Sequence, residues 1–124
     1  MRFTTTTIKG HGRGKFLGFP TINMIIPESL TFSMKHGVYA ARAKVKDEKY
    51  IGALYYGPAP VFKEKQAALE IYLIDTTNFY MNHDEEIEIE AVKFIRGVED
   101  FGLPELLVEQ MKKDVEQIRE ILKK

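Results

Sequence analysis

The alternation of apolar and polar residues predicts short β-strands over most of the chain. Such strands are expected in six segments: 3–8, 21–26, 37–45, 50–57, 69–75 and 86–95. The first two are rich in Thr and Ile, which favour an extended backbone, and Pro27 ends the second. A polar turn joins the third and fourth segments, so we expect them to form a hairpin.

The last of these segments carries glutamates at every second position. Glu86, Glu88 and Glu90 alternate with Ile87 and Ile89, which is typical of a strand with one buried and one solvated face. Because carboxylates at this spacing are common on surface strands, we interpret the acidic row as a solvated face and not as a metal site.

The period changes to that of a helix at Pro104, a residue that is favourable at a helix start. The apolar stripe of this helix consists of Leu107, Met111, Val115, Ile118 and Leu122. Six strands followed by a single helix, without regular alternation of the two, predict an antiparallel barrel or sandwich that the helix covers. We expect residues 1–124 to form one domain.

Charge and composition narrow the range of partners. The 124 residues include 18 Lys plus Arg and 18 Asp plus Glu, so the formal net charge is zero. A neutral chain does not attract nucleic acid or an anionic membrane through its overall field, so neither is expected as a partner. The absence of cysteine excludes disulfides and thiolate metal ligands. The first residues lack a signal-peptide pattern, so we expect a cytoplasmic protein.

A glycine-rich segment is the first candidate for a binding site. Four of the nine glycines lie within residues 10–18, together with Arg13 and Lys15. Backbone N–H groups and two cations suit the oxygens of a phosphate. The segment is not a Walker A motif, because Phe16 follows Lys15 where a hydroxyl is needed. Taken alone, the segment fits a flexible hairpin loop as well as a ligand loop.

Two polar side chains at the entry to the second strand add oxygen ligands. Thr21 and Asn23 are two residues apart and project to the same face of a strand. Their hydroxyl and amide oxygens suit Mg²⁺, which relies on phosphates and water for its other ligands. The alternative is a turn that the two side chains close. The three histidines, His11, His36 and His83, have no zinc-type spacing.

Glu70 is the only charged residue in the apolar run 67–74. A carboxylate in such a run costs free energy unless it is paired or lies in a cleft, which makes Glu70 a candidate catalytic group. The alternative is a strand glutamate that faces solvent.

The order of these features resembles the riboflavin kinase (flavokinase) family. Residues 12–23 are similar to the signature of the family, including its Pro-Thr-x-Asn motif at residues 20–23. Further similar elements follow in order along the chain: 37–40, 69–73, the aromatic pair Phe79 and Tyr80, residues 94–96 with Phe101, and the helix with Asp114.

This resemblance implies a six-stranded antiparallel Greek-key barrel with a C-terminal helix. It also implies transfer of the γ-phosphoryl group of ATP to the ribityl 5′-hydroxyl of riboflavin, which gives FMN and ADP. In that reaction Thr21 and Asn23 would bind Mg²⁺, and Glu70 would accept the hydroxyl proton as general base.

The resemblance also implies residues for each substrate. Nucleotide binding is expected for Gly12, Arg13, Gly14, Lys15, Gly18, Phe79 and Tyr80. Flavin binding is expected for Arg96 and Asp114. The aromatic pair fits plain core as well as an adenine pocket, and an arginine at a strand end is also common on surfaces.

Two departures from the family pattern keep other functions open. Val61 stands where the family usually has Thr, and Met81 where it usually has Gly. A non-catalytic flavin- or nucleotide-binding module is therefore the alternative function. A barrel that binds single-stranded nucleic acid through aromatic rings is a third candidate, which the zero net charge disfavours. We expect a monomer whose reaction stops at FMN, because the FAD-forming domain of fused relatives does not fit in 124 residues.

Overall fold

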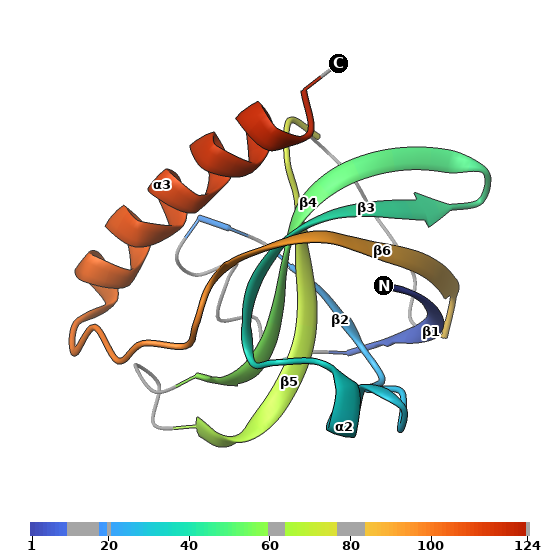
Figure 1. The fold of residues 1–124 in the computed structure, drawn as a ribbon, viewed down its shortest axis with the longest axis horizontal. Coiled ribbons are helices and arrows are strands. Elements are labelled where there is room, and N and C mark those ends of the chain that lie inside the picture. The colour runs from blue at the N-terminus through green and yellow to red at the C-terminus, as the bar shows by residue number, and fades with distance from the viewer. Residues whose placement is uncertain (10–17, 20, 60–63, 77–83, 124) are drawn as a thin grey trace.

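The computed structural model describes residues 1–9, 18–19, 21–59, 64–76 and 84–123. Its elements are β1 (Arg2–Ile8), β2 (Ile22–Met24), α2 (Leu30–Ser33), β3 (Gly37–Val45), β4 (Glu48–Ala59), β5 (Glu64–Leu73), β6 (Glu86–Arg96) and α3 (Pro104–Ile121) (Figure 1). Neighbouring strands are antiparallel and close into a barrel in the order β1-β2-β5-β4-β3-β6. The predicted six-stranded antiparallel barrel with a C-terminal helix is confirmed.

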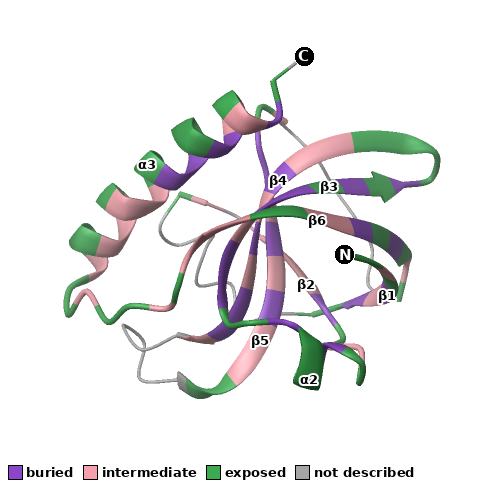
Figure 2. Ribbon diagram, in the orientation of Figure 1, coloured by how far each residue is buried: buried purple, intermediate pink, exposed green. Residues whose placement is uncertain are grey.

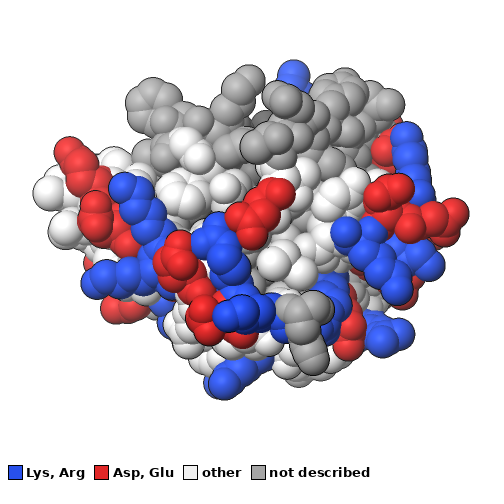
Figure 3. Space-filling view, turned by 90° about the horizontal axis from the view of Figure 1, so that it is seen from above, with Lys and Arg blue, Asp and Glu red and all other residues white. Residues whose placement is uncertain are grey.

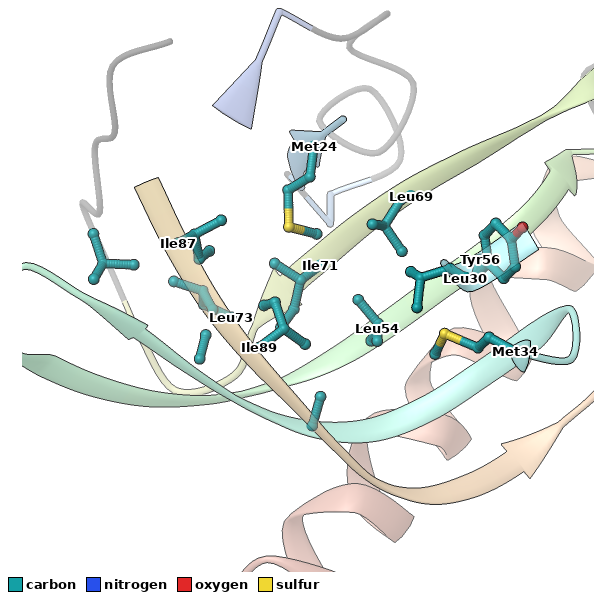
Figure 4. Close-up of a cluster of buried hydrophobic side chains, with 13 residues drawn as sticks. Met24, Leu30, Met34, Leu54, Tyr56, Leu69, Ile71, Leu73, Ile87 and Ile89 are labelled. Carbon is teal, nitrogen blue, oxygen red and sulfur yellow. The ribbon is translucent and has the colours of Figure 1, made fainter. Parts of the chain in front are cut away.

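Apolar side chains from one face of the strands fill the barrel interior, as Figure 4 shows. The larger ones are Met24, Leu54, Tyr56, Leu69, Ile71, Leu73, Ile87 and Ile89. Leu30 of α2 and Met34 just after it are buried in the same cluster. The short helix therefore contributes to the core, although it has a single turn.

A second apolar layer lies outside the barrel, beneath α3. Its buried members are Val38, Ala40, Ile74, Val115, Ile118 and Leu122. Figure 2 shows α3 buried on the side that faces the strands and exposed on the other. Because successive residues of a strand point to opposite faces, Ala40 packs in this outer layer and Ala41 in the interior. In the predicted helical stripe, Leu107 and Met111 are only half-buried.

One additional helix and the bounds of several strands differ from the sequence prediction. The expectation of a single helix is wrong, because the structure also contains α2. This helix is one turn long, which is too short to show a helical period in the sequence. The strand β2 has only three residues, so Thr21 precedes it. The strand β5 begins at Glu64 and ends before Asp75, where a φ of 58° turns the chain.

Gly37 allows β3 to begin in close contact with β6. Its φ is 152°, and a Cβ at this position would collide with the backbone carbonyl of Arg96 and lie 2.7 Å from the Phe94 ring. The approach that brings β3 beside Arg96 therefore requires glycine at this position.

Charged side chains of both signs mix on the barrel surface. Glu86 and Glu88 are exposed, and Glu90 lies 3.6 Å from Arg2, which confirms the predicted solvated face. In Figure 3, basic and acidic side chains lie side by side, and neither sign forms a continuous patch on the face drawn. The described ranges contain no group of three or more His, Cys, Asp or Glu suited to a metal. None of the helices described here is long and apolar enough to cross a membrane.

Candidate active site

Glu70 lies on the outer face of the barrel, in the middle of β5. Its neighbours Leu69 and Ile71 are buried in the interior, so the pleat turns Glu70 outward, where it is half-buried. The strand register places Asn23 of β2 opposite Glu70 on one side and Tyr55 of β4 opposite it on the other. Because residues directly opposite each other share a face, the amide and the carboxylate are neighbours.

Thr21 is hydrogen-bonded to this carboxylate. Its Oγ1 donates to Oε1 of Glu70 at 2.9 Å, although the two residues are 49 positions apart in sequence. Tertiary structure thus brings Glu70 together with Thr21 and Asn23, the pair that the sequence nominated apart from it. Their position on adjacent, paired segments of a closed barrel holds the group in one arrangement.

The donor set fits a magnesium ion. Hydroxyl, amide and carboxylate oxygens are hard ligands of the kind that Mg²⁺ prefers. A hydroxyl has one proton and two lone pairs, so Thr21 can donate to Glu70 and still present oxygen to a cation. The hydrogen bond and metal binding at the same hydroxyl are therefore compatible.

An aromatic contact lies beside this group. The rings of Phe19 and Tyr72 meet edge to face, with their centroids 5.2 Å apart and their planes at 70°. Tyr72 follows Glu70 by two positions on β5 and shares its outer face. Gly18, which precedes Phe19, has a φ of 89°, a conformation that side chains rarely adopt.

Arg96 and Asp114 form a buried ion pair between the end of β6 and α3. Nη2 of Arg96 donates to Oδ2 of Asp114 at 2.8 Å, and Nε lies 3.1 Å from both carboxylate oxygens. The side chains are only 14% and 4% exposed, respectively. Gln110, one helical turn earlier, donates to Oδ1 of Asp114 at 3.0 Å. The guanidinium also lies 5.4 Å from the Phe101 ring centroid.

Several predicted site residues lie outside the described residues. They are Gly12, Arg13, Gly14, Lys15, Phe79 and Tyr80, and the departures Val61 and Met81 lie there as well. Of the expected nucleotide-binding residues, only Gly18 is described.

The sequence interpretation did not include four residues that the structure adds around these groups: Phe19, Tyr55, Tyr72 and Gln110. A signal for Gln110 was present, because a residue four positions before a helical aspartate lies on the same helix face. The position of Tyr55 depends on strand pairing and that of Phe19 on its packing against Tyr72, and no local pattern shows either.

The fold and the site together define a small barrel domain with the groups that phosphoryl transfer requires. Oxygen atoms of the kind that bind Mg²⁺ and a half-buried carboxylate lie together on one outer face of the barrel. Residues 1–122 match the family model Flavokinase, described as riboflavin kinase. The chain belongs to the riboflavin kinase family, which confirms the predicted family.

The similar curated proteins are longer than this chain. A bifunctional riboflavin kinase/FMN adenylyltransferase of Listeria monocytogenes is 35% identical over 116 residues, which are 92% of this chain and 36% of that protein. The RNA-binding riboflavin kinase RibR of Bacillus subtilis is 33% identical over 112 residues, 89% of this chain and 46% of that protein. The chain thus spans a third to a half of the length of these relatives.

Two solved structures share the fold. Riboflavin kinase from Trypanosoma brucei superposes with a TM-score of 0.70 at 20% identity, covering 99% of this chain and 80% of that one. A chain described as a macrolide-efflux protein from Streptococcus pneumoniae gives a TM-score of 0.74 at 24% identity, covering 95% of this chain and 38% of that one. At these identities the likeness concerns the barrel alone.

Proposed function

We propose that this chain phosphorylates riboflavin at its 5′-hydroxyl with ATP and Mg²⁺, giving FMN and ADP. Family membership supports the reaction. The observation that carries the proposal is the hydrogen bond between Thr21 and Glu70, with Asn23 opposite the same carboxylate. These groups supply metal ligands and a proton acceptor within one small area of the barrel.

Glu70 is the proposed general base. As the 5′-hydroxyl oxygen bonds to the γ-phosphorus, its proton passes to the carboxylate, and the bond between the β–γ bridging oxygen and phosphorus breaks to release ADP. The hydrogen bond from Thr21 restricts the orientation of the carboxylate, which favours proton transfer along one direction.

Thr21 and Asn23 would hold the magnesium ion through their oxygen atoms. When bound, Mg²⁺ neutralises charge on the phosphate oxygens. The protein residues contribute orientation, because Asn23 is fixed in the β2–β5 ladder and Thr21 is bonded to Glu70.

On the flavin side, Arg96 is the proposed contact and Asp114 the residue that orients it. Asp114 is 4% exposed and accepts hydrogen bonds from both Arg96 and Gln110. A carboxylate so enclosed acts on a ligand through the guanidinium that it holds.

The predicted nucleotide-binding residues remain part of the proposal: Gly12, Arg13, Gly14, Lys15, Gly18, Phe79 and Tyr80. The positive φ of Gly18 supports a backbone that approaches a ligand closely. We also propose that residues 1–124 form one kinase domain, that it is monomeric without a nucleic-acid partner, and that it acts in the cytoplasm.

The proposal is tested by measuring conversion of riboflavin to FMN. Purified protein is incubated with riboflavin, ATP and MgCl₂, and FMN is measured by chromatography, with Glu70→Gln beside it and the exposed Glu86→Gln as matched control. We expect FMN from the wild type and from Glu86→Gln, and little from Glu70→Gln. No FMN from the wild type would overturn the proposal, and tight flavin binding without turnover would favour the non-catalytic module.

A further inference from the structure

We propose that Tyr72 is a positioning residue for the reaction, because its contact with Phe19 holds Thr21 against Glu70. The inference rests on the proposed function. It adds Tyr72, whose side chain affects the reaction indirectly, through the position of Thr21. It follows from how the polypeptide around Thr21 is attached to the barrel.

The strand ladder stops just before the proposed metal ligand. Pairing between β2 and β5 includes Asn23 with Glu70 and Ile22 with Ile71, and no pair is formed by Thr21. If the register continued, Thr21 would lie opposite Tyr72. The hydrogen bonds of the β2–β5 ladder therefore do not fix the position of Thr21, which depends on other contacts.

The aromatic contact fixes the chain on the far side of Thr21. Phe19, two residues before it, packs edge to face against Tyr72 at a centroid distance of 5.2 Å. Thr21 is thus bracketed by the last ladder pair, which includes Ile22, and by the ring of Phe19. With Phe19 and Ile22 held in this way, the hydroxyl of Thr21 reaches Oε1 of Glu70 at 2.9 Å.

The two rings also rest on the apolar layer beneath α3. Phe19 and Tyr72 pack against the cluster that includes Ile74 of the chain after β5 and Ile118 of α3. Interiors of this kind are close-packed and move little, so the helix gives the rings a firm support. The outer layer therefore serves the site as well as the stability of the fold.

The first experiment compares Tyr72→Leu with Tyr72→Phe. We expect Tyr72→Leu to lower kcat by roughly tenfold, because small displacements of reacting groups are costly, and to raise the Mg²⁺ concentration for half-maximal rate. The KM for riboflavin should stay within about twofold. Tyr72→Phe keeps the aromatic ring and should therefore retain the wild-type rate. Tyr50 is a half-buried tyrosine packed against the barrel interior, and Tyr50→Leu is the matched control. This variant should lower Tm without changing the dependence of the rate on Mg²⁺.

A double mutant separates positioning from a general loss of structure. If Tyr72 acts through Thr21, then Thr21→Ala with Tyr72→Leu should be no slower than Thr21→Ala alone. A readout that does not depend on turnover is the rise in Tm that Mg²⁺ produces in the presence of ADP, which should shrink in Tyr72→Leu and persist in Tyr72→Phe.

The outcomes are distinguishable. Absence of FMN formation by the wild type would refute the proposed function. Wild-type turnover together with full activity of Tyr72→Leu, or with additive effects in the double mutant, would refute the positioning role alone. If Tyr72→Leu does not fold, Phe19→Leu removes the same contact from the other ring and carries the same expectations.

Discussion

Two carboxylates on the outside of the barrel have contrasting surroundings. Asp114 is 4% exposed, and its oxygens accept hydrogen bonds from Arg96 and Gln110. Glu70 is half-buried and accepts a hydrogen bond from the hydroxyl of Thr21. A carboxylate enclosed by a guanidinium is suited to hold structure, whereas one that keeps part of its surface can meet a substrate.

The contrast reflects different costs of burial. Placing the charge of Asp114 among apolar residues of α3 is unfavourable, and the charge-assisted pair with Arg96 offsets it together with the hydrogen bond from Gln110. Glu70 is half-buried at the surface of the barrel, where contact with solvent lowers the cost of placing a carboxylate. The two sites should therefore respond differently to substitution.

The largest expected effect is on catalysis at Glu70. Glu70→Gln keeps the size of the side chain but removes the proton acceptor, so kcat should fall roughly 10²- to 10⁴-fold, about 3–5 kcal/mol in barrier height. Steady-state rates of FMN formation and urea unfolding measure the two properties. Stability should change little, and a fully active variant would show that Glu70 is not the base.

The next effect is on stability at Asp114. Asp114→Asn leaves the guanidinium of Arg96, 14% exposed, without its counter-charge, and the free energy of unfolding should fall by roughly 3 kcal/mol. Urea denaturation measures the loss, with Glu86→Gln as the exposed control. Unchanged stability would mean that the pair does not anchor β6 to α3.

A smaller effect on catalysis is expected from loss of the Thr21 hydroxyl, which donates a hydrogen bond to the proposed base Glu70. Thr21→Val keeps the shape but removes the donor to Glu70, so kcat should fall roughly tenfold, which corresponds to about 1.4 kcal/mol. The Mg²⁺ concentration for half-maximal rate should also rise, because a proposed metal ligand is lost. Titration of MgCl₂ in the FMN assay measures both, and an unchanged titration curve would place the metal elsewhere.

The smallest effect concerns a third, exposed carboxylate. Asp75 is 58% exposed and lies 2.7 Å from Arg119. The hydrogen bond from Arg119 lowers the pKa of Asp75 below its usual value of 3.8. A lowered pKa stabilises the fold above about pH 4, and this contribution disappears as the pH falls through the lowered pKa. Arg119→Gln should slightly reduce Tm at pH 7, and the reduction should be smaller at pH 2 and in 1 M salt. An equal reduction under all three conditions would exclude an electrostatic origin.

Much of the fold was predictable because local periodicity specifies which face of a segment is apolar. The alternation in segment 86–95 correctly gave Ile87 and Ile89 as core and the glutamates as surface. The one-turn helix α2 was not predictable, since four residues do not establish a period. Asp114 was also unpredictable as a buried residue, since a charged side chain on the apolar face of a helix departs from simple amphipathicity. Its burial depends on Arg96, which belongs to a different element.

For the candidate site, residue types and spacing were enough to nominate Thr21, Asn23 and Glu70, since oxygen ligands and an isolated charge in an apolar run are local features. Their meeting on one face was not a local feature. It depends on the β2–β5 register, which pairs Asn23 with Glu70, 47 positions later, and on the closure of the barrel. The contact of Phe19 with Tyr72 likewise arises from packing, because a sequence specifies which surfaces are apolar but only folding brings particular surfaces together.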